Sequence, residues 1–191
     1  MPPKPKHTKE EIVASALEIV AEQGVNALTA KELAHKLHTS TSPIFTVFDS
    51  MQELLDEVKK ATAELFEQYA QKAGAEMPVF KKIGMQMILF AKEEPKLYQL
   101  IFMSQNSGTT PFDSNYAYLG KVAEDCLTAI MADYGLTLEA AQELFEHVWI
   151  HTFGIGALCA TGACDFSEQE ISKMLTQDFT AMMLLLKTKK E

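Results

Sequence analysis

The chain has 191 residues, of which 47% are hydrophobic and 23% are charged, and its formal net charge is −9 at pH 7. This composition predicts a compact, ordered protein, and the acidic balance excludes attraction to nucleic acid by bulk charge, so that any DNA contact must come from a local patch. The longest nearly apolar run, residues 152–164, is too short to span a bilayer, and no signal peptide pattern is present. The three cysteines fit reduced thiols. We therefore expect a cytoplasmic protein with no membrane segment.

The first residues form a segment rich in proline and lysine that precedes any helical pattern. Its positive charges are Lys4, Lys6 and Lys9, and all 17 basic residues of the chain are Lys, so no Arg side chain offers a bidentate contact. We predict a flexible arm that either contacts DNA or only keeps the protein in solution.

Helix starts are marked by four S/T-x-x-E patterns, in which the hydroxyl caps a free backbone N–H and the glutamate reaches back to the cap. The four pairs are Thr8/Glu11, Thr29/Glu32, Ser50/Glu53 and Ser167/Glu170. Apolar residues at helical spacing predict helices over residues 8–24, 29–37, 41–47, 50–72, 79–92, 95–104, 115–134, 138–162 and 168–187. Strand-like alternation is absent, so we expect an all-α protein of about nine helices.

The second and third predicted helices are joined by a tight turn, His38-Thr39-Ser40, which is typical of a helix-turn-helix unit. In such a unit the first two helices hold the third against the major groove of DNA. The third helix begins with the small hydroxyl side chains of Ser40–Ser42, which can contact phosphates or base edges. These features fit either a DNA-binding unit or a three-helix packing unit with no role in DNA binding.

A longer pattern covers roughly residues 10–58 without a gap. Its residues are Leu28–Ala34, Ser40, Ile44, Phe45, Phe48, Ser50 and Glu53–Leu55, and they resemble the N-terminal domain of the TetR family of bacterial transcriptional regulators. A shorter segment, His147–Ile155, is similar to a helix with a Trp…Gly pattern found in many members. The resemblance implies an arm and helix-turn-helix DNA-binding domain at residues 1–50. It also implies a ligand-binding and dimerisation domain at residues 51–191, with a first helix over residues 51–73 that links the two.

The resemblance also implies which side chains face DNA. Thr29 caps the second helix near a phosphate, whereas Thr41, Ser42 and Pro43 face base edges. The full set of expected DNA-binding residues is Thr29, Lys31, Ser40, Thr41, Ser42, Pro43, Phe45, Thr46, Val47 and Met51.

Three of these positions depart from the family pattern. Phe45 stands where Tyr is usual, Val47 where Tyr or His is common, and Met51 where Lys normally meets a phosphate. Because each phosphate contact adds to the salt dependence of binding, we expect weak DNA binding with a shallow salt dependence. The candidates for compensating contacts are Thr46, Lys31, Lys36, His38 and the lysines of the N-terminal arm.

The larger domain is expected to hold an effector and to join two copies of the chain. The resemblance implies a homodimer through the helices at 138–162 and 168–187. Small residues allow close approach of helices there, although packing within one chain explains them equally well: Gly154, Gly156, Ala157, Ala160 and Gly162. Apolar and aromatic residues of the middle helices are candidates for a hydrophobic pocket, or else for the core: Met85, Phe90, Phe102, Met103, Tyr118, Trp149 and Phe153.

Metal sites and enzymatic sites have little support in the sequence. His147 and His151 share one helix face, as two metal ligands do, but no third ligand is assignable, and Cys159 and Cys164 form no C-x-x-C pair. The chain lacks a phosphate-binding glycine loop and a G-x-S-x-G elbow. We therefore expect no metal, no cofactor and no enzymatic activity.

Together these patterns predict a ligand-responsive transcriptional regulator, a repressor that leaves a palindromic DNA operator when a small hydrophobic effector binds. The alternative is a dimeric helical protein that binds a small molecule and has weak or lost DNA affinity. The apolar residues at three expected DNA contacts favour this second hypothesis.

Overall fold

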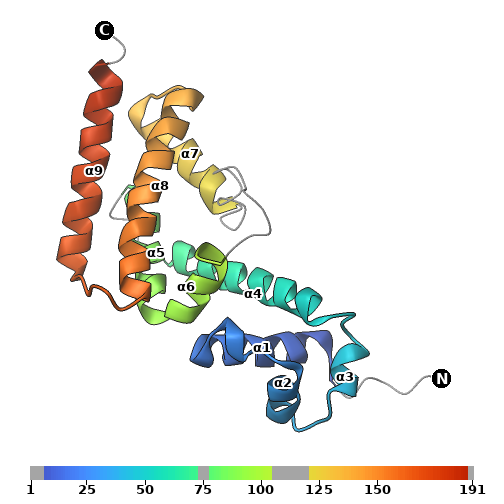
Figure 1. The fold of residues 1–191 in the computed structure, drawn as a ribbon. Helices are drawn as coiled ribbons and strands as arrows, with labels where there is room; N and C mark the ends of the chain where they lie inside the picture. The colour runs from blue at the N-terminus through green and yellow to red at the C-terminus, as the bar shows by residue number, and fades with distance from the viewer. Residues whose placement is uncertain (1–6, 73–77, 105–120, 189–191) are drawn as a thin grey trace. The chain divides into compact units, whose positions relative to one another are not determined.

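The computed structural model describes residues 7–72, 78–104 and 121–188. Within these ranges the chain forms nine α-helices and one short 3-10 helix, and it contains no strand (Figure 1). The prediction of an all-α fold is therefore confirmed. The helices are α1 (Lys9–Gln23), η1 (Val25–Ala27), α2 (Ala30–Lys36), α3 (Ser42–Phe45), α4 (Met51–Gln71), α5 (Val79–Glu93), α6 (Pro95–Phe102), α7 (Lys121–Tyr134), α8 (Leu138–Ala160) and α9 (Glu168–Thr188). A search of the described helices finds none with the length and hydrophobicity that a membrane crossing requires.

Side-chain caps hold the helix starts as the sequence predicts. At α1, the Thr8 hydroxyl accepts a hydrogen bond from the Glu11 N–H at 3.2 Å, and the Glu11 carboxylate accepts one from the Thr8 N–H at 3.0 Å. The same reciprocal pair forms between Ser167 and Glu170 at α9. At α4, the Ser50 hydroxyl caps the Glu53 N–H at 3.1 Å. Each of these bonds satisfies a backbone donor that the helix itself leaves free.

The contacts between residues divide the chain into two compact units. Unit 1 comprises residues 1–65 and 96–104, and unit 2 comprises residues 66–95 and 105–191. The division falls inside α4, and α6 belongs to unit 1 except for its first residue. The sequence instead led us to divide the chain at residue 50, between the end of the helix-turn-helix and α4.

Unit 1 has a core built from one face of each of its helices. Its hydrophobic residues with exposed fractions of 0–1% are Ile12, Ala16, Ile19, Val20, Leu33, Ile44, Phe48, Leu54, Val58, Leu97 and Tyr98. These residues recur at helical spacing in α1 and α4, so burial of each amphipathic face explains why the short helices α2 and α3 are held in place.

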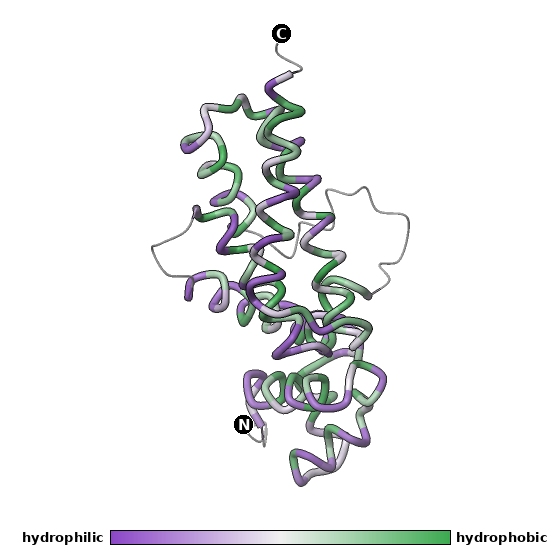
Figure 2. Tube along the Cα trace, turned by 90° about the vertical axis from the view of Figure 1, so that its left-hand side faces the viewer, coloured by the Kyte–Doolittle hydropathy of each residue, from purple (hydrophilic) through white to green (hydrophobic). Residues whose placement is uncertain are grey.

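Unit 2 is organised around α8, which packs against α5, α7 and α9. Figure 1 shows α8 and α9 side by side, and in Figure 2 the helix that leads to the C-terminus carries both hydrophilic and hydrophobic residues. Buried residues of α5, α8 and α9, among them Ile88, Ile155 and Leu175, meet in one apolar cluster. Leu175 belongs to this cluster and also lines the cavity described below, so the two features share part of α9.

The connection between α8 and α9 is ordered by several local bonds. Gly162 has a φ of +70°, which a glycine adopts without steric cost, and the Leu158 carbonyl accepts from the N–H groups of Ala163 and Cys164 at 3.0 and 3.2 Å. Further along, the Lys92 ammonium of α5 donates to the Phe166 carbonyl at 2.8 Å and lies 2.8 Å from an Asp165 carboxylate oxygen. The two helices thus meet at a corner that is tied to α5.

Candidate DNA-binding surface and ligand cavity

The predicted helix-turn-helix is formed in unit 1 by α2, a turn and α3. The Thr29 hydroxyl caps α2 by accepting from the Glu32 N–H at 3.1 Å, and the turn is closed by the Thr39 N–H, which donates to the Ala34 carbonyl at 2.9 Å. His38 has a φ of +51° there, a left-handed conformation that costs energy for any residue other than glycine. The third helix is shorter than the predicted 41–47, because α3 covers only Ser42–Phe45.

The α3 helix is anchored on one side and exposed on the other. Ile44 and Phe48 are each only 1% exposed and enter the core of unit 1. The hydroxyl side chains of Ser40–Ser42 are exposed, and Phe45 is 47% exposed. Because the anchors fix the rotation of the helix, this polar and aromatic side faces away from the core of unit 1.

The remaining residues expected to contact DNA differ in how exposed their side chains are and in whether their polar groups are already hydrogen-bonded. Thr46 is exposed, but its hydroxyl donates to the Pro43 carbonyl at 2.6 Å. Pro43, Val47 and Met51 are half-buried, so each offers part of an apolar side chain rather than a polar group. This leaves Ser40–Ser42 as the hydroxyl groups at the start of α3.

Two lysines near this surface, Lys36 and Lys9, form ion pairs with acidic residues. The Lys36 ammonium lies 2.8 Å from the Glu18 carboxylate and 3.9 Å from that of Glu22, and the hydrogen bond to Glu18 raises the pKa of Lys36. Lys9 lies 3.2 Å from Glu57, and its ammonium is 5.7 Å from the centre of the Phe48 ring. Lys31 is exposed and has no ion pair within the described part of the chain. The arm residues 1–6 lie outside that part.

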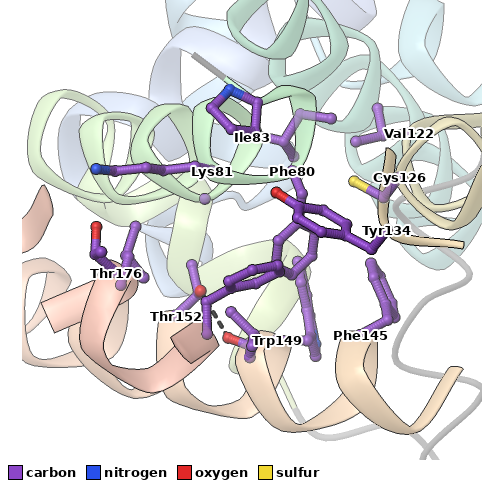
Figure 3. A pocket seen from close by; sticks show the side chains of 15 residues that line it. Phe80, Lys81, Ile83, Val122, Cys126, Tyr134, Phe145, Trp149, Thr152 and Thr176 are labelled. Carbon is purple, nitrogen blue, oxygen red and sulfur yellow. Dashed lines mark hydrogen bonds between the residues drawn. The ribbon is translucent and has the colours of Figure 1, made fainter. Parts of the chain in front are cut away.

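Unit 2 contains a cavity of about 300 Å³ between α5, α7, α8 and α9. Figure 3 shows the side chains of its wall, with Tyr134, Phe145 and Trp149 converging on one space. Its wall residues are Pro78, Phe80, Lys81, Ile83, Gly84, Val122, Cys126, Tyr134, Phe145, Val148, Trp149, Thr152, Leu175, Thr176 and Phe179. Both the size and the mainly apolar wall are typical of sites for small organic molecules.

The aromatic side chains of the wall contact one another. Phe80 lies with its ring centre 6.1 Å from that of Phe145 and 5.9 Å from that of Phe179. Tyr134 is 5.0 Å from Phe179, and Trp149 is stacked on Phe145 at 6.1 Å with an interplanar angle of 13°. These contacts are in the range of favourable aromatic pairs, so the wall is partly held in shape by its own rings.

Most polar groups of the wall are already hydrogen-bonded within the protein or are uncharged. The Thr152 hydroxyl donates to the Val148 carbonyl at 2.7 Å (Figure 3), and the Thr176 hydroxyl donates to the Ser172 carbonyl at 2.7 Å. Burial raises the pKa of the Cys126 thiol to about 12 and also raises the pKa of Tyr134, so both are neutral at pH 7. Lys81 is the one charged residue among those that line the cavity.

Of the seven residues proposed from the sequence for a pocket, the structure places Trp149 in this wall. Phe90 is fully buried and packs on Phe66 and Tyr69, with ring centres 5.6 and 5.2 Å away, so it is a core residue. Met85 packs against the aliphatic cluster of unit 2, and Phe153 is half-buried on α8. Phe102 and Met103 belong to unit 1, and Tyr118 lies outside the described residues.

Four aromatic wall residues were not predicted from the sequence: Phe80, Tyr134, Phe145 and Phe179. Phe145 and Trp149 are four residues apart on α8, which is the spacing of one helix face and was the signal that could have paired them. Phe80 and Phe179 come from α5 and α9, and only the tertiary packing brings them to the same space.

The histidines proposed and dismissed as metal ligands do not form a cluster. The His151 Nδ1 atom lies 4.0 Å from the Asp178 carboxylate of α9. Among the residues that can be described, no group of three or more His, Cys, Asp or Glu side chains is arranged to hold a metal ion. Cys159 and Cys164 are half-buried free thiols.

The outer sides of α8 and α9 expose large apolar residues. Ile150 is 53% exposed, Leu158 41%, Leu184 61% and Leu185 46%. A Cβ atom added to Gly154 would have no neighbour within 4 Å, whereas Gly156 and Ala160 are buried within the chain. The small residues of α8 thus divide between internal packing and an open face.

A match to a protein family covers most of unit 1. The family model described as "Bacterial regulatory proteins, tetR family" matches residues 12–58, the segment from the first buried residue of α1 into the second turn of α4. Residues 12–58 form a TetR-family N-terminal domain. The resemblance noted in the sequence is thereby confirmed, and so is the expectation of a regulatory protein rather than an enzyme. No curated protein matches the sequence.

Solved structures extend the TetR fold to the whole chain. A TetR-family protein from Vibrio parahaemolyticus is similar at 16% identity with a TM-score of 0.61, covering 91% of this chain and 97% of that one. FadR from Thermus thermophilus, a repressor solved with lauroyl-CoA, has 14% identity and a TM-score of 0.61, with 92% and 93% covered. A TetR variant from Acinetobacter baumannii solved with minocycline has 17% identity and a TM-score of 0.60, with 97% and 99% covered. At these identities the likeness shows the fold.

Proposed function

We propose that the protein is a dimeric transcriptional repressor that binds a palindromic DNA operator through α2 and α3 and is released by a small organic effector in the cavity of unit 2. The observation that carries this proposal is the surface of α3 within a TetR-family domain. Ile44 and Phe48 anchor one side of the helix in the core, and the exposed hydroxyls of Ser40–Ser42 lie at its start. Small hydroxyl side chains and free N–H groups in such a position contact phosphates and base edges.

The cavity supports control by a ligand. It has the volume and the apolar wall of a small-molecule site, and similar folds have been solved with lauroyl-CoA and with minocycline. An effector that binds one conformation of the regulator more tightly than another shifts the population between them, and in this way it changes DNA affinity without touching DNA.

The exposed apolar side chains of α8 and α9 support a homodimer. Burying Ile150, Leu158 and Leu184 against a second copy removes apolar area from water, and the space above Gly154 admits a close helix. A Leu184→Glu variant is expected to be monomeric in sedimentation equilibrium, because two carboxylates would have to be buried at a symmetric interface. A charge change away from α8 and α9, Lys96→Glu at an exposed site of α6, is expected to leave the dimer intact.

The test of DNA binding is selection from a pool of randomised duplexes at low salt, followed by titration with salt. We expect enrichment of a palindrome with half-sites about one helical turn apart and a shallow negative slope. A double variant, Thr41→Ala with Ser42→Ala, should lose the enrichment, whereas Thr180→Ala, at an exposed hydroxyl of unit 2, should retain it.

The second candidate function is a dimeric small-molecule binder with little DNA affinity. It is favoured by the apolar side chains of Phe45, Val47 and Met51 at expected DNA contacts, and by the pairing of Lys36 with Glu18. No enrichment from the pool by a folded dimer would establish this second function over the first.

A further inference from the structure

A second cavity of unit 2, of about 240 Å³, adjoins the aromatic cavity and has a different chemical character. It is lined by the last turns of α4, the start of α5 and the start of α7. Ile83 and Val122 line both cavities, so the two spaces meet at these side chains. The aromatic cavity supplies an apolar wall, and the second cavity supplies polar groups.

The most buried polar group of the second cavity is the side chain of Lys82. It is only 9% exposed, and it has no ion pair or hydrogen bond to any residue that the structure describes. The stem of Lys82 is packed in the protein, so the side chain has little freedom to lose when its ammonium meets an anion. A carboxylate can therefore gain more there than at an exposed, mobile lysine.

The other charges of this cavity lie closer to water. Lys121 and Asp125 are exposed, and Glu67 is half-buried. Exposed charges are screened by solvent and contribute little to binding, so the formal balance of two lysines and two acids does not describe the interior. Among the four charged residues of this cavity, Lys82 is the least exposed.

The aromatic cavity excludes a cation on the same grounds. Aromatic faces attract cations, but none of the 15 wall residues of that cavity is Asp or Glu, and its one charged residue is Lys81. A cationic ligand would meet Lys81 in the aromatic wall with no carboxylate there to offset it, and the two carboxylates of the adjoining cavity, Glu67 and Asp125, are already matched by Lys82 and Lys121.

From these observations we propose that the effector is an organic carboxylate, whose aromatic or aliphatic body fills the aromatic cavity and whose carboxylate pairs with Lys82 in the adjoining one. This proposal rests on the proposed function only in naming the ligand an effector, because binding to the two cavities is measured without DNA. The pair is a charge-assisted hydrogen bond made by a lysine whose stem is held in place, and such bonds are the strong ones.

The ligand test uses the full chain and the fluorescence of Trp149, which is the one Trp of the sequence and stands in the wall of the aromatic cavity. Three carboxylates are titrated, phenylbutyrate, naphthoate and decanoate, each beside its uncharged primary amide. The variants are Lys82→Met, which keeps the length of the side chain, and the control Lys187→Met at an exposed lysine of α9. Both variants remove one positive charge.

We expect at least one carboxylate to bind about tenfold more tightly than its amide, and Lys82→Met to remove that preference while Lys187→Met retains it. Equal binding of every acid and its amide, tighter binding of the amides, or no binding of any carboxylate would overturn the proposal.

The outcomes separate this proposal from the proposed function. A preference for carboxylates that depends on Lys82, found in a protein that selects no DNA, supports the ligand class and rejects the regulator. DNA selection by a protein that shows no such preference does the reverse. Should Lys82→Met fail to fold, the comparison of acid and amide on the unaltered chain still decides whether charge is recognised, and Lys82→Arg should keep the preference.

Discussion

Restoring a cation at Met51 tests the expected DNA surface most directly. Met51 is the first residue of α4 and is half-buried, and the helix start beside it is fixed by the hydrogen bond from the Glu53 N–H to the Ser50 hydroxyl. A Met51→Lys side chain has a similar length, so its stem can follow the same path while the ammonium extends into water. If this position faces a phosphate, the variant adds one phosphate contact to each subunit.

The magnitude follows from counterion release and from the helix dipole. One added contact steepens the slope of log affinity against log salt by about 0.9, so the gain over the unaltered protein should be about 3.5-fold larger at about 50 mM than at about 200 mM salt, for each added contact. The added ammonium lies in the first turn of a 21-residue helix, next to the positive end of the helix dipole. This repulsion lowers the free energy of unfolding by about 0.3–1 kcal/mol.

The assay is fluorescence anisotropy of a labelled duplex over a salt series, for Met51→Lys and for Met51→Gln as the uncharged control. We expect the Lys variant to bind all sequences more tightly and with a steeper slope, and the Gln variant to keep the original slope. Identical slopes for Lys and Gln would refute the reasoning, because a cation within reach of a phosphate must release counterions.

Three further predictions concern stability and reactivity. The Tyr69 hydroxyl donates to a Glu93 carboxylate oxygen at 2.8 Å, so Tyr69→Phe should lower the free energy of unfolding by about 1 kcal/mol in urea titrations at pH 7. Burial, followed by that hydrogen bond, raises the pKa of Tyr69 to about 12, so its contribution is complete below the unfolded pKa near 10 and is lost as the pH rises toward 12. A difference between the two proteins that grows in the unaltered protein's favour above pH 10 would contradict this cause. His38→Gly should raise the free energy of unfolding by about 0.5 kcal/mol, because Gly adopts the left-handed φ of +51° without the steric strain that His has there. This gain exceeds the loss from the greater freedom of Gly in the unfolded chain. A loss of stability would show that the His38 side chain makes a larger contribution. Cys126 is 2% exposed and burial raises its pKa to about 12, so a disulfide reagent at pH 8 should modify the two other cysteines first and Cys126 only on unfolding; three thiols reacting at one rate, or an unchanged slow phase in Cys126→Ser, would oppose this assignment.

Helix starts were the most predictable part of the fold, because they are set by neighbouring residues. Thr8 with Glu11, and Ser167 with Glu170, form the reciprocal bonds that their spacing predicts. At α4 the prediction is right about the Ser50 hydroxyl, which caps the Glu53 N–H. It is wrong about the Glu53 carboxylate, which accepts from the N–H of Asp49 at 2.7 Å and not from that of Ser50. Local spacing cannot tell which of two adjacent N–H groups a flexible carboxylate will reach.

The wall of the cavity was the least predictable part, because helical spacing marks an inward face without saying what that face meets. Phe90 and Trp149 are both aromatic and inward, yet Phe90 packs among core rings and Trp149 borders open space. Phe80 and Phe179 are nearly 100 residues apart in sequence and meet only through the packing of α5 on α9. Such convergence depends on helix crossings, which one sequence does not encode locally.

The ordered corner between α8 and α9 makes Cys164 a suitable site for a spectroscopic probe. Its backbone N–H is bonded to Leu158, and the residues that follow are tied to Lys92 of α5 and to the cap at Ser167. A spin label there, with Cys159→Ser, would be attached to backbone that is fixed to the neighbouring helices, so a change in its mean distance to a label on α7 would report movement of helices. Distance distributions with and without a carboxylate would then show directly how far the walls of the cavity move when it is filled.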